Sequence, residues 1–307
     1  MHYFLGIDAG GTITRCALAQ GTDVLARSDG GSIKITRVSE AEAEKNLERM
    51  LSALAAQSGI ALRSVTGTCV GLSGYMIAPV ADWVRNALEA RVSGPIYICG
   101  DEEIALDAAF HGGAGILVIA GTGSNVVGRT SQGRQVHAGG WGPILSDQGS
   151  GNGIGLQALR AIFYAIDASE ETSMLPAVHA AWNTQTIEDL IDLGNRIPGP
   201  DFSQLAPLVA QCAEEGDGVA RRVLQRAGED LADLVFLAMR QGASFEAAPS
   251  SNPWTVAFSG SVVHNISLVR ESMIAAIHRL DPTVQFLLKA PDPVLGAVWR
   301  ASQSDCI

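Results

Sequence analysis

The sequence predicts an α/β fold with two domains, each a mixed sheet that is led by a β-meander and carries helices. This prediction rests on two glycine-rich turns, Asp8-Ala9-Gly10-Gly11-Thr12 and Gly121-Thr122-Gly123-Ser124-Asn125. Each turn stands between two short apolar runs, as expected for a turn between two strands. In both halves, the strands after the meander alternate with helical patterns, which is typical of α/β architecture. A length of 307 residues also favours two domains.

The first half, residues 1–113, begins with three expected strands that are joined by tight turns. A helix follows, because Leu47, Leu51 and Leu54 recur at helical spacing. The small-residue stretch from His111 to Gly115 marks the expected domain boundary. The predicted order is βββαβαβα, with strands at 3–8, 13–19, 23–28, 69–72 and 95–99 and helices at 41–57, 80–90 and 102–110.

The second half, residues 114–307, repeats the meander and continues with longer helices. We expect the last helix, at about 292–302, to be a candidate for packing back on the N-terminal domain. The predicted strands are 116–120, 124–129, 134–138, 255–258 and 284–288, and the predicted helices are 151–166, 202–214, 218–240, 266–280 and 293–301.

Composition excludes several classes of partner. The formal net charge of −11 argues against nucleic acid and anionic membranes. No apolar run approaches the roughly 20 residues of a membrane span, and the start lacks a secretory pattern. The five cysteines show no C-x-x-C spacing, which predicts reduced thiols in a cytoplasmic protein. The six histidines form no metal-binding motif.

The first turn is not one of the common nucleotide-binding loops. The sequence has no G-x-x-x-x-G-K-[ST], and none of its three lysines, Lys34, Lys45 and Lys289, follows a glycine turn. A strand rather than a helix follows the first turn, which disfavours a Rossmann site. Phosphate charge must then be met by backbone N–H groups, hydroxyls and a metal ion. Asp8, at the end of the first strand, is placed to hold Mg²⁺ through water.

The paired turns resemble those of the actin-like ATPase superfamily, whose domains have a ribonuclease H-like fold and enclose an interdomain cleft. Four further segments strengthen the likeness: Gly139-Gly140-Trp141-Gly142, Ser146-Asp147-Gln148-Gly149-Ser150-Gly151, Ala213-Glu214-Glu215-Gly216-Asp217 and Phe258-Ser259-Gly260-Ser261-Val262. Together they resemble the BadF/BadG/BcrA/BcrD-type group, which contains N-acetylglucosamine and glucosamine kinases. The likeness covers the whole chain in order.

This resemblance implies an ATP-dependent amino-sugar kinase that phosphorylates the 6-hydroxyl of N-acetylglucosamine, with glucosamine as the alternative acceptor. ATP and Mg²⁺ are the implied cofactors, and a homodimer is the implied assembly. Asp101 is implied as the catalytic base, since it follows a buried strand; the alternative is that it merely caps the next helix. The implied nucleotide contacts are Asp8, Gly10, Gly11, Thr12, Gly121, Thr122, Gly123, Ala213, Gly260 and Ser261.

The implied sugar contacts are Ser124, Asn125, Gly140, Trp141, Gly142 and Asp147, of which Asp147 is the strongest candidate. Trp141 has two open interpretations, stacking on a sugar ring or packing in the core. The loop after the third strand departs from the family pattern, because Gly31-Ser32-Ile33-Lys34-Ile35 lacks the usual sugar-contacting Asn. This departure leaves the exact sugar open.

Two other classes stay open as alternatives. An activator ATPase of the same superfamily needs cysteines for an iron–sulfur cluster between subunits, but no cysteine lies between Cys99 and Cys212. A non-catalytic sugar sensor on the same fold is disfavoured by Asp101. ROK-type hexokinases are disfavoured, because their cysteine-rich zinc motif has no counterpart here.

Overall fold

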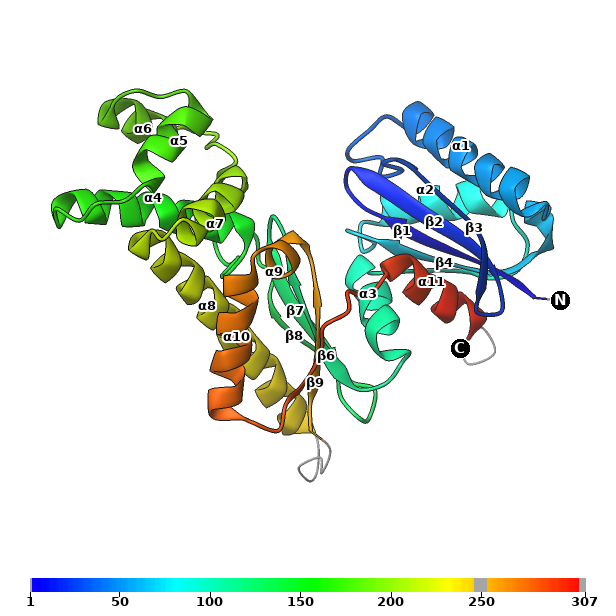
Figure 1. Ribbon diagram of the computed structural model, residues 1–307. Coiled ribbons are helices and arrows are strands. Elements are labelled where there is room, and N and C mark those ends of the chain that lie inside the picture. The colour runs from blue at the N-terminus through cyan, green and yellow to red at the C-terminus, as the bar shows by residue number, and fades with distance from the viewer. Residues whose placement is uncertain (1, 246–252, 304–307) are drawn as a thin grey trace. The chain divides into compact units, whose positions relative to one another are not determined.

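The computed structural model describes residues 2–245 and 253–303, and the chain forms two compact units. Unit 1 comprises the residues up to Gly113 together with the segment that begins at Pro291, and unit 2 comprises Ala114–Ala290. Each unit contains one five-stranded mixed sheet (Figure 1). The two units are described separately.

The sheet of unit 1 has the strand order β3-β2-β1-β4-β5. Its first three strands form an antiparallel meander, whereas β4 runs parallel to β1 and β5 runs parallel to β4. The carboxyl ends of β1, β4 and β5 therefore lie at one edge, which is where α/β proteins gather functional groups. The strands are β1 (Tyr3–Ala9), β2 (Ile13–Gln20), β3 (Asp23–Gly31), β4 (Val65–Leu72) and β5 (Ile96–Cys99).

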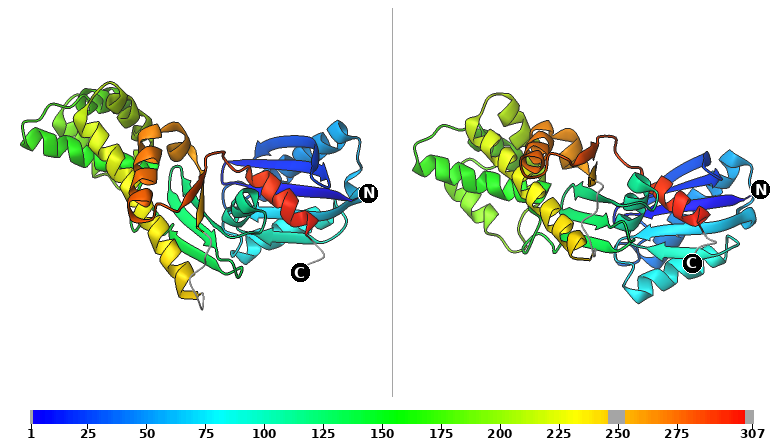
Figure 2. Two further views of the ribbon diagram at one scale, coloured as in Figure 1. Left: turned by 60° about the horizontal axis from the view of Figure 1, so that its bottom comes forward. Right: turned by 90° about the horizontal axis from the view of Figure 1, so that it is seen from below.

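Helices cover both faces of this sheet. Alternate residues of β1, such as Leu5 and Ile7, join the core beneath α1 (Glu40–Ser58) and α2 (Ala78–Glu89). The other face packs against α3 (Asp101–Phe110) and α11 (Pro293–Ser302), so the C-terminal helix belongs to unit 1. A short 3₁₀ turn, Leu62–Ser64, precedes β4. Figure 2 shows α11, in red, against the sheet.

Helices α3 and α11 approach each other closely at a glycine. A Cβ atom added at Gly296 would lie 1.8 Å from the carbonyl oxygen of Ile104, so no larger residue fits without moving one helix. The close approach brings Arg300 of α11 to the carboxylates of α3, which matters for the site below.

The sheet of unit 2 has the order β10-β9-β6-β7-β8, with an antiparallel meander from β6 to β8. Strand β9 is parallel to β6, and β10 is parallel to β9. The turns after β6 and β9 therefore share one edge of the sheet. The strands are β6 (Gly115–Ala120), β7 (Ser124–Arg129), β8 (Gln135–Gly139), β9 (Thr255–Ser259) and β10 (Gln285–Leu287).

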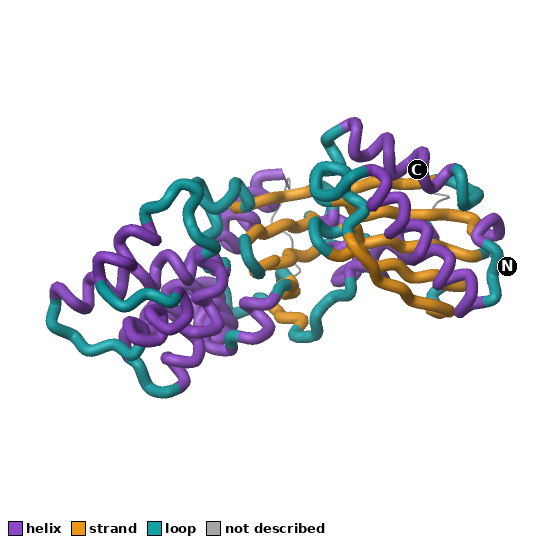
Figure 3. The backbone as a smooth tube through the Cα atoms, turned by 90° about the horizontal axis from the view of Figure 1, so that it is seen from above, coloured by secondary structure: helices purple, strands orange, loops and turns teal. Residues whose placement is uncertain are grey.

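The helices of unit 2 enclose the larger core. The long helix α8 contacts α4, α7 and α10 as well as β7 and β8, and Phe258 of β9 is buried in this core. Figure 3 shows the strands, in orange, as a single layer beside these helices. The helical segments are α4 (Gly151–Asp167), α5 (Met174–Trp182), α6 (Ile187–Gly194), a 3₁₀ turn (Phe202–Leu205), α7 (Ala206–Glu214), α8 (Gly218–Phe245), α9 (Ser261–Asn265) and α10 (Ser267–Leu280).

The sequence-based prediction missed helices α5 and α6. Helix α5 buries only two residues, Met174 and Val178, so its apolar period is too short to recognise. Helix α6 buries only Leu190, yet its capping box between Thr186 and Asp189 is a signal that could have found it. The expected single helix over 202–214 is divided, because α7 begins afresh with a proline in its first turn.

Strand β4 begins at Val65, earlier than expected, since its paired length matches all of β1. Cys16, Cys69, Cys99 and Cys212 are buried and form no disulfide, whereas Cys306 lies outside the described residues. Within the described part of the chain, no helix is both long and apolar enough to cross a membrane.

Candidate functional site

Asp8 lies near the carboxyl end of β1 in unit 1. Its carboxylate Oδ2 is 3.7 Å from Nη1 of Arg15 on β2, a long and partly exposed ion pair. Burial raises the pKa of Asp8 to about 6; the Arg15 charge opposes this shift, whereas the negative charges of Asp101 and Asp292 add to it. A nearby cation would stabilise the ionised form of such a carboxylate, which burial makes unfavourable.

Asp101 is the first residue of α3, directly after β5. Gly100 is the N-cap residue, and its N–H donates to Glu103 Oε1 at 3.1 Å, so capping does not depend on the Asp101 side chain alone. Burial raises the pKa of Asp101, while the backbone N–H groups of Asp101 and Glu102 and the charge of Lys34 act in the opposite direction. The carboxylate thus lies at the positive end of a helix.

The loop after β3 connects the first glycine turn to Lys34. Ser32 Oγ donates to the Gly10 carbonyl at 3.2 Å and accepts the Lys34 N–H at 3.1 Å. The Lys34 ammonium donates to Ser73 Oγ at 2.9 Å. Arg37 lies beside the first glycine turn, since a Cβ added at Gly11 would lie 4.0 Å from Arg37 Nε. One loop therefore places two cations at this edge.

A partly buried ion-pair network holds the start of α3 from the opposite helix. Arg300 of α11 donates to Asp107 Oδ2 at 2.6 Å and to Glu103 Oε2 at 2.9 Å. Asp107 is fully buried, and Glu103 also accepts the Gly100 N–H. Because Asp101 directly follows Gly100, this network fixes the backbone that carries the Asp101 carboxylate.

The second glycine turn, in unit 2, is bonded to the beginning of α4. Within the turn, the Gly121 N–H donates to the Gly123 carbonyl at 2.9 Å. The carbonyls of Gly121 and Thr122 accept N–H groups from Gly151 at 2.8 Å and from Asn152 at 3.0 Å. The turn is thereby fixed by the main chain of a neighbouring helix.

Asp147 also supports this turn. Its Oδ1 accepts the Ser124 N–H at 3.2 Å, and it is only 6% exposed. Its backbone has φ 81°, a strained value for a residue with a side chain. The Ser124 hydroxyl donates to the Gln148 carbonyl at 2.7 Å. Two predicted sugar-binding side chains, Asp147 and Ser124, thus bind the turn and its neighbouring loop in this structure.

A pocket of about 450 Å³ lies beside the second turn. Gly260, directly before its lining residue Ser261, has φ 100°, and an added Cβ would lie 2.3 Å from the Ala120 carbonyl oxygen, so only glycine fits there. The pocket is lined by Gly121, Thr122, Gly151, Ser203, Ala206, Pro207, Ala210, Gln211, Glu214, Ser261, Val262, Asn265 and Ile266.

Ala213 does not line this pocket. Its side chain is 3% exposed and belongs to the core, whereas Ala210 and Glu214 of the same helix reach the pocket. The helical phase of α7 turns Ala213 away from the cavity, whereas its neighbour Glu214 lines it.

Trp141 is exposed rather than packed in the core, because 69% of its surface is accessible. Among the described residues, its ring lies edge-to-face with His137, with centroids 5.6 Å apart. Gly140 and Gly142 on either side have positive φ values of 73° and 91°. An atom added at Gly140 would lie 3.0 Å from Asn125 Oδ1, so Asn125 adjoins this segment.

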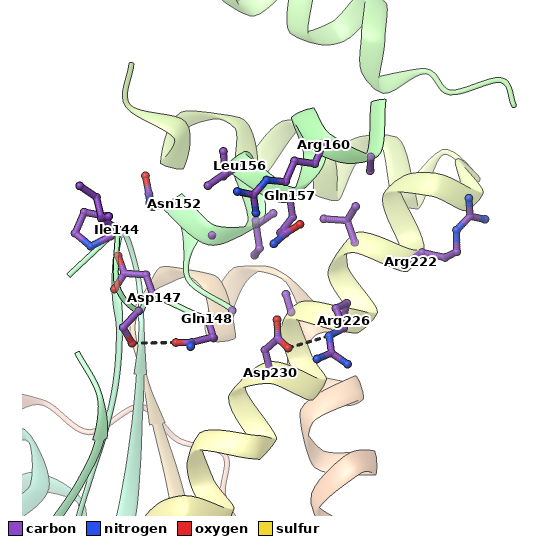
Figure 4. A pocket seen from close by; sticks show the side chains of 18 of the residues that line it. Ile144, Asp147, Gln148, Asn152, Leu156, Gln157, Arg160, Arg222, Arg226 and Asp230 are labelled. Atoms are coloured by element: carbon purple, nitrogen blue, oxygen red, sulfur yellow. Dashed lines mark hydrogen bonds and ion pairs between the residues drawn. The ribbon is translucent and has the colours of Figure 1, made fainter. Parts of the chain in front are cut away.

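A second pocket of unit 2, of about 590 Å³, lies between the 143–149 loop, α4 and α8 (Figure 4). Asp147 and Gln148 line it from the loop, and Arg160 lines it from α4. Arg226 and Asp230 of α8 pair within it at 2.9 Å. Ile144 on the same loop is 94% exposed. This pocket combines apolar side chains with paired charges.

Within residues 2–245 and 253–303, no three His, Cys, Asp or Glu side chains gather as a metal-binding group. Asp8 nevertheless suits a water-mediated Mg²⁺. It is a mostly buried carboxylate, and the negative charges of Asp101 and Asp292 raise its pKa further. Among the described residues, this edge does not bring together several protein ligands that could coordinate the ion directly.

Residues 5–299 match the BadF/BadG/BcrA/BcrD ATPase family. The chain belongs to this family. An N-acetylmuramic acid/N-acetylglucosamine kinase of Clostridium acetobutylicum is 28% identical over 312 residues, which cover 100% of both chains. An N-acetyl-D-glucosamine kinase of Dictyostelium discoideum is 25% identical over 98% of each chain.

A solved structure from Chromobacterium violaceum, described as a candidate N-acetylglucosamine kinase, has the same fold with a TM-score of 0.71. It is 25% identical and covers 97% of this chain and 98% of its own. This BadF/BadG/BcrA/BcrD family member therefore shares its full length with proteins named as amino-sugar kinases.

Sequence reasoning overlooked several residues of unit 1 that lie near the first turn or support Asp101. Arg37 carries no motif signal, and the link from Arg300 to Glu103 and Asp107 joins opposite ends of the chain. The Glu103 contact to Gly100 could have been found, because an acidic residue at the third helical position is a capping-box signal.

Proposed function

We propose that this protein is an ATP-dependent amino-sugar kinase that transfers the γ-phosphate to the 6-hydroxyl of N-acetylglucosamine. Glucosamine is the alternative acceptor. The observation that carries the proposal is the Asp101 carboxyl, which is largely buried at the N-terminus of α3 and at the same sheet edge as Asp8 and Lys34. The names of the full-length relatives support the same reaction.

The nucleotide is proposed to bind through backbone groups and hydroxyls. Adenosine fits the 450 Å³ pocket, which Ser261 lines together with Gly121 and Thr122. Gly10, Gly11, Thr12, Gly121, Thr122 and Gly123 are the proposed phosphate contacts. Arg37, next to the first turn, adds the positive charge that the turn itself lacks.

Asp8 is the proposed holder of Mg²⁺ through water. When bound, Mg²⁺ neutralises charge on the phosphate oxygens during transfer. The pKa of Asp8, about 6, makes the ionised carboxylate available at neutral pH. The cation would stabilise the ionised carboxylate of Asp8, which burial otherwise makes unfavourable.

Asp101 is proposed to accept the proton of the sugar hydroxyl as that oxygen attacks the γ-phosphorus. A pKa that is raised by burial makes Asp101 a stronger base, and the helix N-terminus keeps it ionised and oriented. The proposed sugar contacts are Ser124, Asn125, Gly140, Trp141, Gly142 and Asp147. The exposed indole of Trp141 is available to stack on a sugar ring.

A coupled ADP-release assay with Mg·ATP and a panel of sugars tests this function. The panel contains N-acetylglucosamine, glucosamine, N-acetylmannosamine, N-acetylmuramic acid and glucose. Strong stimulation by an N-acetylated amino sugar supports the proposal, and stimulation by glucosamine supports the alternative acceptor. ATP binding without stimulation by any sugar contradicts the kinase function. We also propose a homodimer, which light scattering tests independently.

A further inference from the structure

The 590 Å³ pocket of unit 2 gathers positive charge in an acidic protein. Arg160 of α4 and Arg222 and Arg226 of α8 line it, together with two carboxylates, Asp147 and Asp230. Three positive charges against two negative ones leave the lining with a net charge of +1, whereas the whole chain carries −11. Such a local excess of positive charge attracts anions that the rest of the surface repels.

The three arginines of this pocket differ in their partners. Arg226 pairs with Asp230 at 2.9 Å, and Arg222 Nη2 donates to both carboxylate oxygens of Glu170 at 2.7 Å. Among residues 2–245 and 253–303, no carboxylate or other acceptor binds the Arg160 guanidinium. Gln157, one turn earlier on α4, lines the same wall (Figure 4). Arg160 and Gln157 therefore present N–H donors that a ligand can engage.

Apolar side chains form much of the remaining lining. Ile144 and Leu145 of the 143–149 loop are 94% and 80% exposed, and Val223 and Ala227 contribute from α8. A ligand that covers such exposed apolar groups removes them from water, which favours binding. The volume lies within the roughly 300–1,000 Å³ of small-molecule sites, so the pocket accommodates a compact organic molecule rather than a bare inorganic ion.

A groove toward the C-terminal end of α8 offers a comparison within the same unit. It is also apolar, with Leu237 and Trp254 in its lining, but its charged residues are Arg240, Asp233 and Asp281. Two carboxylates outnumber one guanidinium there, so this groove repels an anion that the 590 Å³ pocket attracts. Charge rather than apolar surface thus distinguishes the two.

We propose that the 590 Å³ pocket is a second ligand-binding site, which takes an organic anion with a flat apolar body and one acidic group. The Arg160 guanidinium binds the acidic group, Gln157 donates a further hydrogen bond, and the apolar body covers Ile144 and Leu145. The site is distinct from the proposed adenosine pocket, since no residue lines both. Binding there does not depend on the proposed kinase reaction.

Two fluorescent probes that differ in one charge test this site in the intact protein. 1-Anilinonaphthalene-8-sulfonate carries a sulfonate on an aromatic body, and N-phenyl-1-naphthylamine is its neutral counterpart. We expect one sulfonate probe to bind per chain. Arg160→Gln should weaken its binding by about fivefold, as expected for one exposed charge pair, and Arg160→Glu by more than about tenfold. The neutral probe should bind all three proteins with affinities within about twofold, and Arg160→Lys should retain part of the sulfonate affinity.

Arg240→Gln is the matched control, because it removes the same charge from the other groove and should leave the binding of both probes unchanged. Arg160 and Arg240 are both exposed, so these variants should fold, and unchanged melting temperatures verify this. No sulfonate binding by the wild type, or unchanged affinity in Arg160→Glu, overturns the inference, and so do equal losses for both probes. Displacement of the sulfonate probe by Mg·ATP or N-acetylglucosamine also overturns it, since the probe then occupies the proposed kinase site. Loss of binding as the protein self-associates does so too, because it assigns the pocket to a contact between copies.

Discussion

The two glycine-rich turns look alike in sequence but are held in different ways. The turn of unit 1 has one internal backbone hydrogen bond, from the Gly10 N–H to the Ile13 carbonyl at 3.1 Å, and is surrounded by charged side chains such as Asp8 and Arg37. The turn of unit 2 is fixed by two main-chain bonds to the start of α4 and by Asp147.

This difference indicates a division of labour. The edge of unit 1 offers titratable and charged groups, which suit proton transfer and phosphate charge. The edge of unit 2 offers a backbone held by main-chain hydrogen bonds and a pocket that is lined by Glu214 but by no lysine or arginine, which suit recognition by shape and hydrogen bonds. Substitutions beside Asp101 in unit 1 should therefore change the chemistry, whereas substitutions in the pocket beside the second turn of unit 2 should change nucleotide affinity.

The largest effect is expected from Asp101→Asn. Loss of a general base typically lowers kcat by about 10²–10⁴-fold, and ATP affinity should stay within about twofold because the proposed adenosine pocket lies in unit 2. Steady-state kinetics and equilibrium ATP binding check both parts. Glu102→Gln, one position further along α3, is the matched control for charge. A fall in kcat below tenfold would contradict the role of Asp101 as base.

Arg300→Met should give the next largest effect, on stability. It leaves the buried Asp107 carboxylate and Glu103 without their guanidinium partner, which costs about 3 kcal/mol. Chemical denaturation measures this loss. Because Glu103 holds the Gly100 N–H, kcat should fall with it, and Arg300→Lys should restore part of both. Unchanged stability would show that the network does not hold α3.

Ala210→Phe should raise KM for ATP by about 10- to 100-fold, because the ring fills the pocket beside the second turn. Ala210 is only partly buried, so the fold should tolerate the larger side chain, and an unchanged melting temperature verifies this. Single-turnover rates at saturating ATP should remain near those of the wild type. Normal ATP affinity in a folded Ala210→Phe protein would place the adenosine elsewhere.

A smaller effect is expected from Asp8→Asn in the ligand-free protein. The folded pKa of about 6 lies above the usual 3.8, so the folded state binds more protons in that window and loses stability as pH rises through it. Asp8→Asn should therefore raise the melting temperature at pH 7.5 and raise it less at pH 5. Activity with Mg·ATP should fall nonetheless. An Asn variant that melts lower at pH 7.5 would contradict this assignment.

The two turns, the βββαβαβα order of unit 1 and the place of Asp101 after β5 could be predicted, because each depends on local sequence periodicity. The rotation of α7 about its axis determines that Ala210 rather than Ala213 faces the pocket. A short apolar repeat in the sequence does not predict this rotation. The Arg300 network and the Asp147 contact to Ser124 join distant segments, so they emerge only from the folded chain.

The most direct test of the division of labour is single-turnover formation of sugar 6-phosphate at saturating ATP in Asp101→Asn and Ala210→Phe, read beside equilibrium ATP binding. We predict that Asp101→Asn binds ATP normally and transfers at least a hundredfold more slowly, whereas Ala210→Phe binds ATP weakly and transfers at nearly the wild-type rate once saturated. Normal transfer by Asp101→Asn, or normal ATP binding by Ala210→Phe, would contradict the account.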